Sequence, residues 1–283
     1  MLVTSIISTK GGVGKTTICA SLGGFVADAG LRVLLIDLDI QPTLSSYFKL
    51  EGMSPGGSYE LVAFNEINLE KIISLTSVNR LDLIYSNDDK GQLNTLLLHA
   101  PDGRFRLRNL LHIFDGYYDL LLIDTQGARS VLLEMAVIAS QMVISPVTPE
   151  VLAAREFRRG TLQLMEDIAP YKSLGVSPPP LHMLVNRFPA VSSSARMVHQ
   201  SLKKIFANHE GIHIIKTVIP QIEAYARAST QAQPVHRIER TKPSGRVTPA
   251  ALETIKQLAI EIFPQWKNQF EHVTGKLEHH DET

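Results

Sequence analysis

The chain has 283 residues, enough to bury a large core, and its 44% hydrophobic and 20% charged residues are ordinary for a globular protein and too apolar for a disordered one. Its 28 Lys/Arg balance its 28 Asp/Glu, which argues against a protein that coats nucleic acid with its whole surface. The single cysteine, Cys19, excludes an internal disulfide and a cysteine-pair metal site.

Charge is unevenly distributed along the chain. Residues 51–150 carry 7 Lys/Arg and 13 Asp/Glu, whereas residues 183–246 carry 10 Lys/Arg and 3 Asp/Glu. This asymmetry predicts a basic surface in the second half. The sequence has neither the pattern of a signal peptide nor an apolar run near the roughly 20 residues of a membrane-spanning helix. Together with the lone cysteine, these features indicate a cytoplasmic protein.

Short apolar runs alternate with longer stretches of helical periodicity, which predicts βαβ units around a mainly parallel sheet. Because the runs are apolar on both faces, helices should cover both sides of the sheet. We predict one α/β domain over residues 1–275 and a flexible polar tail at residues 276–283. The predicted strands are Leu2–Ser8, Arg32–Asp39, Leu81–Ser86, Asp119–Asp124, Gln141–Val147, His182–Arg187 and Ile212–Pro220. The predicted helices include Thr16–Ala29, Leu152–Ile168 and Ser194–Ala207, and the predicted loops are Glu51–Ser58, Leu174–Pro180 and Thr241–Pro249.

A glycine-rich segment with the sequence KGGVGKTT lies between the first predicted strand and the first predicted helix. In that position glycines let backbone N–H groups turn around phosphate oxygens, and the helix N-terminus adds its positive dipole end. Lys15 would then reach the β- and γ-phosphates, and the Thr16 hydroxyl would bind Mg²⁺. The alternative is a flexible glycine turn. The predicted phosphate-binding loop comprises Lys10, Gly11, Gly12, Val13, Gly14, Lys15, Thr16 and Thr17.

The loop departs from the usual phosphate-loop pattern at two positions. Thr9 stands where the usual pattern has its first glycine, and Lys10 adds a second lysine at the start. In this form the loop resembles the deviant Walker A motif of the ParA/MinD family of P-loop ATPases, and the chain is most similar to the ParA/Soj-like partition ATPases. The resemblance implies a P-loop NTPase fold and ATP hydrolysis with Mg²⁺. It also implies that Lys10 crosses a dimer interface to the partner's phosphates, so that ATP joins two subunits.

Two predicted strands end in carboxylates. Asp37 and Asp39 are two residues apart, which puts both on one face at the carboxyl end of a strand, where α/β sheets bind ligands. Asp124 ends another apolar strand in the Walker B manner, which predicts that it binds the metal through water. The resemblance implies that Asp37 helps to hold Mg²⁺ and that Asp39 orients the attacking water. Unrelated strand-end carboxylates are the alternative. The TQG sequence after Asp124 departs from the two prolines common in the family.

The resemblance extends to three later positions. Asn186 and Pro220, each in a strand-end position, match family residues that line the adenine, although ordinary strand ends are the alternative. Glu150 belongs to a segment similar to one near the nucleotide and the dimer face in the family. Capping of the following helix is an equal alternative for Glu150.

The residues favour one branch of this family. A lone cysteine does not suit the iron–sulfur members. A membrane-associated positioning ATPase resembling MinD would end in a basic amphipathic helix. Here Ala250–Phe263 is amphipathic, but residues 247–283 carry 3 Lys/Arg against 6 Asp/Glu, so anionic lipid should repel them. The basic residues that are candidates for contacts to DNA phosphates are Arg187, Arg196, Lys203, Lys204, Arg227, Arg237, Arg240, Lys242 and Arg246.

We therefore expect a slow, partner-stimulated ATPase that forms a homodimer with ATP and binds DNA non-specifically. It would partition a plasmid, a mobile element or a chromosome with a ParB-like adaptor protein, without a membrane. It would be cytoplasmic and associated with the nucleoid. Two alternatives remain open: a MinD-like membrane-associated positioning ATPase, and a nucleotide-gated scaffold with little hydrolysis.

Overall fold

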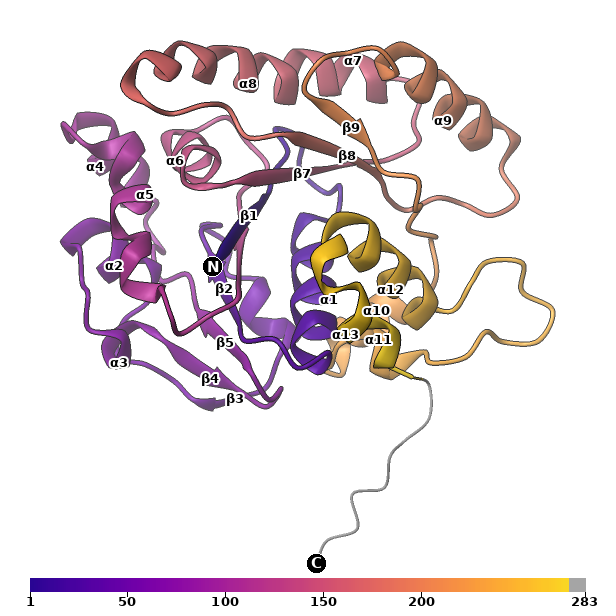
Figure 1. Cartoon of the computed structure of the whole chain (residues 1–283), viewed down its shortest axis with the longest axis horizontal. Helices are drawn as coiled ribbons and strands as arrows, with labels where there is room; N and C mark the ends of the chain where they lie inside the picture. The colour runs from indigo at the N-terminus through magenta and orange to yellow at the C-terminus, as the bar shows by residue number, and fades with distance from the viewer. Residues whose placement is uncertain (275–283) are drawn as a thin grey trace, which may run out of the picture.

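The computed structural model of the chain describes residues 1–274 as a nine-stranded sheet between two layers of helices (Figure 1). The strand order is β3-β4-β5-β2-β6-β1-β7-β8-β9, with parallel pairing from β5 to β9 and antiparallel pairing of β3, β4 and β5 at one edge. The predicted fold class is confirmed. The predicted tail at residues 276–283 lies outside the described residues. The strands are β1 Leu2–Ile6, β2 Val33–Asp37, β3 Leu50–Gly52, β4 Ser74–Thr76, β5 Leu81–Ile84, β6 Leu120–Asp124, β7 Met142–Val147, β8 Leu181–Val185 and β9 Ile212–Ile214.

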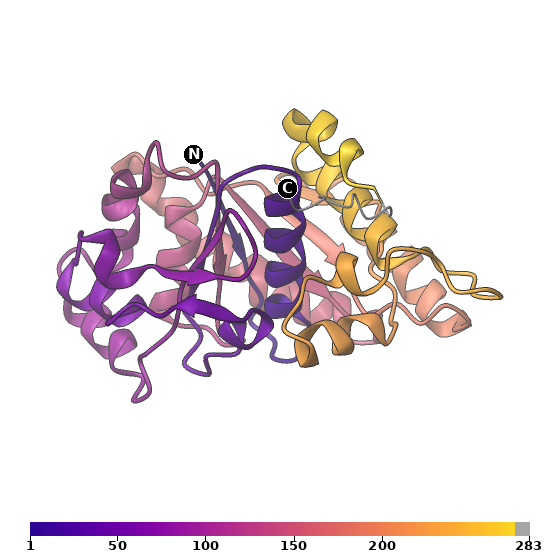
Figure 2. The ribbon, with the colours of Figure 1, turned by 90° about the horizontal axis from the view of Figure 1, so that it is seen from below.

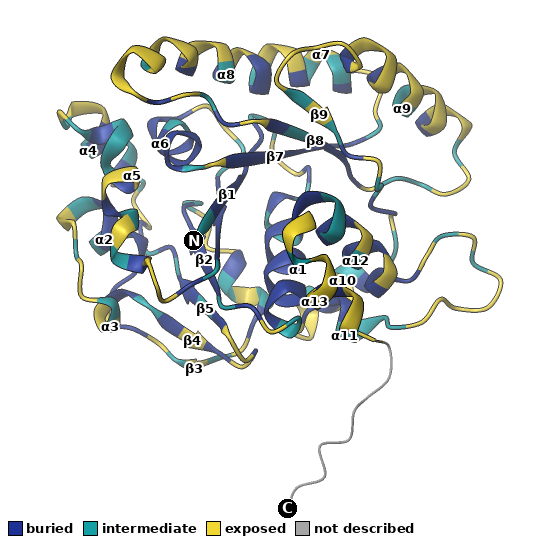
Figure 3. Ribbon diagram, viewed as in Figure 1, coloured by how far each residue is buried: buried dark blue, intermediate teal, exposed yellow. Residues whose placement is uncertain are grey.

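Alternate residues of the central strands face two cores. Leu35 and Leu122 pack on the side of α1 and α12, whereas Ile36 and Ile123 pack on the side of α6. Figure 2 shows these layers from below, and Figure 3 shows the sheet and α1 buried between more exposed outer helices. The helices are α1 Lys15–Asp28, α2 Ser58–Phe64, α3 Leu69–Ile72, α4 Gln92–His99, α5 Arg106–Leu110, α6 Val131–Ala139, α7 Ala153–Phe157, α8 Gln163–Ile168, α9 Ser193–Phe206, α10 Ala224–Thr230, α11 Val235–Ile238, α12 Ala251–Ile262 and α13 Lys267–His272.

Three local expectations were wrong. The predicted loop Glu51–Ser58 overlaps β3 at one end and the start of α2 at the other. The predicted helix Leu152–Ile168 is interrupted by a π-helical turn at Arg158–Leu162, between α7 and α8. The predicted strand Ile212–Pro220 pairs as a strand only at its start, because the Glu261 carboxylate of α12 accepts hydrogen bonds from the two amides at positions 216 and 217, shortly after β9.

Within residues 1–274, no helix combines the length and the apolar character that crossing a bilayer would require.

Candidate functional site

The glycine-rich loop connects β1 to α1, as its sequence predicts. Gly12 and Gly14 have φ angles of 74° and 91°, in the left-handed region that side chains with a Cβ rarely adopt. A Cβ on Gly14 would also lie 2.3 Å from the Asn186 amide nitrogen. Gly14 directly precedes α1, so the loop delivers its backbone to the N-terminus of a helix. That arrangement suits a phosphate group.

Lys15 and three carboxylates converge at the ends of neighbouring strands. In the register of β2 and β6, Asp37 lies directly beside Asp124, and both side chains are fully buried. Burial lowers the pKa of Lys15, while the charges of Asp124 and Asp39 act in the opposite direction. Asp39 is half-buried, and its carboxylate accepts a hydrogen bond from the Gln41 amide at 3.1 Å. The structure thus brings together the lysine and carboxylates that sequence reasoning selected.

The buried carboxylates fit a divalent cation. Within the described chain, Oδ2 of Asp124 has no hydrogen-bond partner although it is buried. Burial raises the pKa of Asp124 to about 7, against the opposing effects of the Thr16 hydroxyl and Lys15. Burial and the neighbouring Asp124 raise the pKa of Asp37 well above its usual range. An ion of two positive charges would stabilise both ionised forms. Because all the donors are oxygen atoms, Thr16, Asp37 and Asp124 fit Mg²⁺.

Asp37 also holds the segment that follows β2. Its two oxygens accept hydrogen bonds from the amides of Asp39 at 3.0 Å and Leu44 at 3.2 Å. This folds residues 38–44 back towards α1, where the Thr43 hydroxyl lies 3.4 Å from that of Thr16. Sequence reasoning missed Thr43. Its only sequence signal is its place six residues after Asp37.

Lys10 points away from the buried carboxylates. Its Nζ lies 2.8 Å from the carboxylates of both Glu150 and Glu156, and these hydrogen bonds raise the pKa of Lys10. The Glu150 side chain therefore contacts the phosphate loop; the residue before α7 is Leu152, with no side-chain cap. In the structure Glu150 contacts Lys10 and does not cap α7, and its place near the nucleotide and the dimer face stays a prediction. Sequence reasoning missed Glu156, since its contact with Lys10 spans 146 residues.

Two adjoining cavities open beside the loop. One, of about 510 Å³, is lined by Thr17, Asn186 and Pro220, together with Tyr47 and Tyr225, which sequence reasoning missed. The other, of about 410 Å³, is lined by the first residues of the phosphate loop, and the two cavities share Arg187 and Gln221.

Asn186 and Pro220 thus line one cavity. Asn186 directly follows a strand, as the sequence predicts, whereas Pro220 does not end one. Asn186 follows β8, and its side-chain amide donates to the Val13 carbonyl at 2.7 Å, which ties the cavity wall to the phosphate loop. Pro220 lies beyond β9 and pairs with Phe188 through an isolated bridge. A polar loop next to a partly apolar cavity can hold the phosphates and the base of a nucleotide.

Two of the basic candidate residues have structural roles. Arg237 forms an ion pair with Asp28, and Arg246 forms a two-pronged ion pair with Glu239 at 2.5 and 2.7 Å. Arg196, Lys203 and Lys204 are exposed on α9. Ion pairs within the chain thus engage two of the nine candidates.

A phosphate loop after β1, with buried carboxylates at the ends of the adjacent strands β2 and β6, defines a P-loop nucleotide-binding protein. A family model described as an AAA domain matches residues 1–173. The chain belongs to the ParA/MinD family of P-loop ATPases.

Relatives agree with this assignment along most of the chain. The sporulation initiation inhibitor protein Soj of Bacillus subtilis is 27% identical over 258 residues, 91% of this chain and 98% of Soj. Among solved structures, apo McdA of Cyanothece is similar in fold with a TM-score of 0.73 and 20% identity, covering 96% of this chain and 97% of McdA. A plasmid partition protein of Borrelia burgdorferi bound to AMPPNP has a TM-score of 0.66 and 24% identity, covering 95% and 97%.

Proposed function

We propose that this protein is a ParA-type partition ATPase: an ATP-dependent dimerisation switch that binds DNA non-specifically and segregates a plasmid, a mobile element or a chromosome. The observation that carries the proposal is that the two lysines of one loop have different surroundings. Lys15 is buried beside the carboxylates, and Lys10 faces outward on the side of α7. Relatives named for sporulation control and plasmid partition support the same role. Residues 1–275 would act as one ATPase domain.

The nucleotide would bind along the phosphate loop, Lys10 to Thr17, with its base in the cavity that Asn186 and Pro220 line. Thr16, Asp37 and Asp124 would hold Mg²⁺, which neutralises phosphate charge when bound. Lys15 would contact the phosphates. Asp39, half-buried near Lys15, would accept a hydrogen bond from the attacking water and orient it.

Lys10 would act across a dimer interface. In the single chain, Glu150 and Glu156 hold its ammonium group, so dimerisation would exchange these two partners for the phosphates of the other subunit's nucleotide. Such an exchange keeps a charge-assisted contact in both states. Turnover would be slow in the protein alone and faster with a ParB-like adaptor, while the cytoplasmic, ATP-bound dimer associates with the nucleoid.

The test is binding to non-specific duplex DNA with ATP, with ADP and without nucleotide, at about 50 and 200 mM salt. Asp39→Ala should keep ATP binding while blocking hydrolysis, and so hold the ATP state. We expect tight DNA binding only with ATP, and a steep loss of affinity at the higher salt concentration. Anionic lipid vesicles form a parallel arm. Binding to vesicles but not to DNA would contradict the proposal and favour a membrane-associated positioning ATPase.

A further inference from the structure

The segment after β6 is fixed at both of its ends. The Thr125 hydroxyl donates to the Ile6 carbonyl of β1 at 2.9 Å. At the other end, the Ser130 hydroxyl accepts from the Leu133 amide at 3.1 Å and caps α6. The residues between them join the metal-binding end of β6 to α6 and can move only as a short, anchored loop. We call residues 125–130 the β6–α6 loop.

Gly127 of this loop lies directly against the phosphate loop. A Cβ at this position would come within 2.6 Å of the Gly11 Cα and 2.9 Å of the Gly11 nitrogen. Real Cβ atoms do not approach backbone so closely, because the van der Waals repulsion is too strong. The close contact with Gly11 therefore depends on glycine at position 127. Because the two backbones touch, a shift of the β6–α6 loop would displace the phosphate loop as well.

A second glycine presses on the phosphate loop from another segment. Gly160 belongs to the π-helical turn between α7 and α8, and a Cβ there would lie 1.7 Å from the Thr9 hydroxyl oxygen. Such π-helical turns within helices are frequent at functional sites. Residues 9–11 thus have close contacts from two segments, the β6–α6 loop through Gly127 and the π-helical turn through Gly160.

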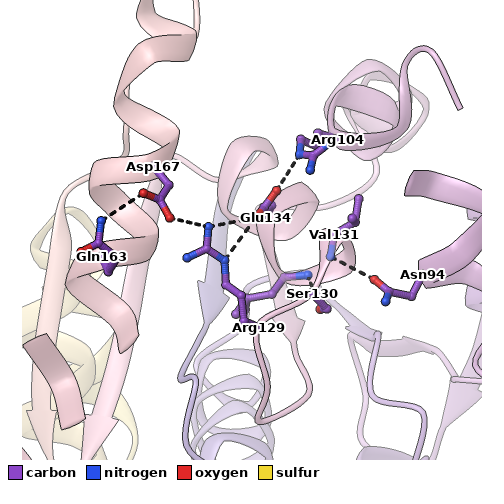
Figure 4. Close-up of polar contacts among 9 residues, drawn as sticks. Asn94, Arg104, Arg129, Ser130, Val131, Glu134, Gln163 and Asp167 are labelled. Atoms are coloured by element: carbon purple, nitrogen blue, oxygen red, sulfur yellow. Dashed lines mark hydrogen bonds and ion pairs between the residues drawn. The ribbon is translucent and has the colours of Figure 1, made fainter. Parts of the chain in front are cut away.

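Arg129 connects the β6–α6 loop to α8, the helix that follows the π-helical turn, as Figure 4 shows. Its Nη2 donates to the Asp167 carboxylate of α8 at 2.8 Å. Its Nε and Nη2 also donate to Glu134 of α6 at 3.1 and 3.0 Å. The neighbouring Arg104 donates to the other oxygen of Glu134 at 2.6 Å but belongs to neither segment. Arg129 therefore links the β6–α6 loop to α8.

We propose that Arg129 is a positioning residue for the nucleotide site. Through its bonds to Asp167 and Glu134 it keeps Gly127 and Gly160 in contact with residues 9–11, and so sets the position of Lys10 and the backbone that cradles the phosphates. The assignment rests on the proposed function only in that the loop binds a nucleotide. Arg129 would not touch the nucleotide itself.

The exposure of Arg129 and its partners distinguishes a role in positioning the phosphate loop from a role in stabilising the fold. The Arg129 side chain is 38% exposed and that of Asp167 is 45% exposed. Its other partner, Glu134, is 14% exposed but also pairs with Arg104, so that carboxylate keeps a guanidinium partner without Arg129. Exposed ion pairs of this kind contribute little to global stability because water screens them. An effect of Arg129 on nucleotide binding would therefore arise from the placement of the loop and not from loss of the fold.

The experiment compares Arg129→Ala with Arg104→Ala, which removes a guanidinium from the same Glu134 carboxylate and leaves the link to α8 intact. Affinity for a fluorescent ATP analogue, kcat and KM for ATP, and Tm would be measured for both. We expect Arg129→Ala to weaken binding about fivefold or more, the usual size of a coupling between sites. Its Tm should stay within about 4 °C of wild type. Arg104→Ala should bind as wild type does.

Two further variants test the link itself. Asp167→Asn should reproduce part of the loss of affinity. In the double variant it should add little to Arg129→Ala, because both changes break the same Arg129–Asp167 contact. Arg129→Lys should restore part of the affinity, since it keeps the charge. Equal affinities for Arg129→Ala and Arg104→Ala would overturn the assignment while leaving the proposed function in place. A wild-type protein that binds the analogue no better than Lys15→Ala would instead overturn the proposed function, and this assignment with it.

Discussion

Two lysines of one loop have opposite surroundings. Lys15 is 6% exposed, and burial lowers its pKa, so a charge is held there at a cost that a bound phosphate would offset. The Lys10 side chain is 36% exposed, and two carboxylates raise its pKa. Lys10 is partly exposed and can exchange its two carboxylate partners for another anion, whereas the buried Lys15 is held in place. Replacing each of the two residues should therefore impair a different measurable property of the protein.

Replacing each lysine by alanine tests this difference. Lys15→Ala should weaken ATP binding about a hundredfold, because a hydrogen bond to a charged group contributes up to about 3 kcal/mol. Lys10→Ala should leave ATP binding by the monomer unchanged and weaken the ATP-dependent dimer. Titration with a fluorescent ATP analogue measures the first effect, and sedimentation velocity with Asp39→Ala as background measures the second. Unchanged dimerisation in the Lys10 variant would exclude a role for Lys10 across the interface.

For single residues, the sequence predicts membership of the site when the residue belongs to a local motif. Lys15, Asp37 and Asp124 could be selected because each occupies a fixed place after a strand, and the structure brings them together. Glu156 and Gly127 could not be selected, since each is defined by a contact with a loop more than a hundred residues earlier in the chain. Their importance depends on the packing of β1 beside β6 and β7, which no local pattern encodes.

Among the elements, burial decides which were predictable. The strands β2 and β6 are buried at every position, and their apolar runs predict them well. The strands β3 and β4 have three residues each at the edge of the sheet, and their pairing depends on one another. Too few residues alternate there for a periodic signal. The π-helical turn has no local periodic signal either, and Gly160 within it approaches Thr9, a residue about 150 positions earlier in the chain.

That approach can be tested by adding one methyl group. Gly160→Ala would place a carbon atom in the space of the Thr9 hydroxyl. We expect it to destabilise the protein by about 1–3 kcal/mol, as overpacked sites do, and to weaken ATP binding by displacing the phosphate loop. Thermal unfolding and ATP titration measure the two effects. The matched variant Thr9→Ala/Gly160→Ala removes the clashing hydroxyl and should recover part of both. No recovery would mean that the glycine serves the helix turn and not the contact.

A separate polar cluster joins the end of α1 to α11. Asp28 accepts hydrogen bonds from Nε2 of His236 at 2.7 Å and from the Arg237 guanidinium. Burial alone would raise the pKa of Asp28, but these hydrogen bonds lower it to about 2. His236 is buried against the Phe25 ring, and burial lowers its pKa. The cluster thus favours an ionised Asp28, while burial disfavours the charged form of His236.

The pKa of Asp28 predicts how stability depends on pH. Its folded value of about 2 is below the unfolded value of about 3.9, so ionised Asp28 stabilises the protein above about pH 4, and this contribution disappears as pH falls through about 2. Asp28→Asn should therefore lower the free energy of unfolding by about 2 kcal/mol at pH 7 and by progressively less below pH 4. Urea unfolding of both proteins from pH 7 to pH 3 measures the difference. A difference independent of pH would show that Asp28 acts through packing alone.

Across the whole molecule, charge and position divide the chain into two halves. The acidic residues 51–150 include β3, β4 and α2–α5 at one end of the sheet, whereas α9 and the projecting loop between α11 and α12 lie towards the other end (Figures 1 and 2). The ion pair of Glu239 with Arg246 closes the base of that loop, and Lys242 is exposed within it. Under the proposed function, the exposed basic residues of this end would contact DNA phosphates.

The basic end makes a prediction about salt dependence. Lys203→Ala/Lys204→Ala removes two exposed charges from α9. We expect weaker ATP-dependent DNA binding and a salt slope reduced by about 0.9 for each DNA phosphate that is no longer neutralised, with ATP binding and Tm unchanged. The matched control Lys71→Ala/Lys90→Ala removes the same charge from exposed positions of the acidic end, and should leave the slope as in wild type. Fluorescence anisotropy with a labelled duplex at several salt concentrations distinguishes the two pairs. Equal salt slopes for the two double variants would mean that DNA binding depends on the net charge of the protein and not on this surface.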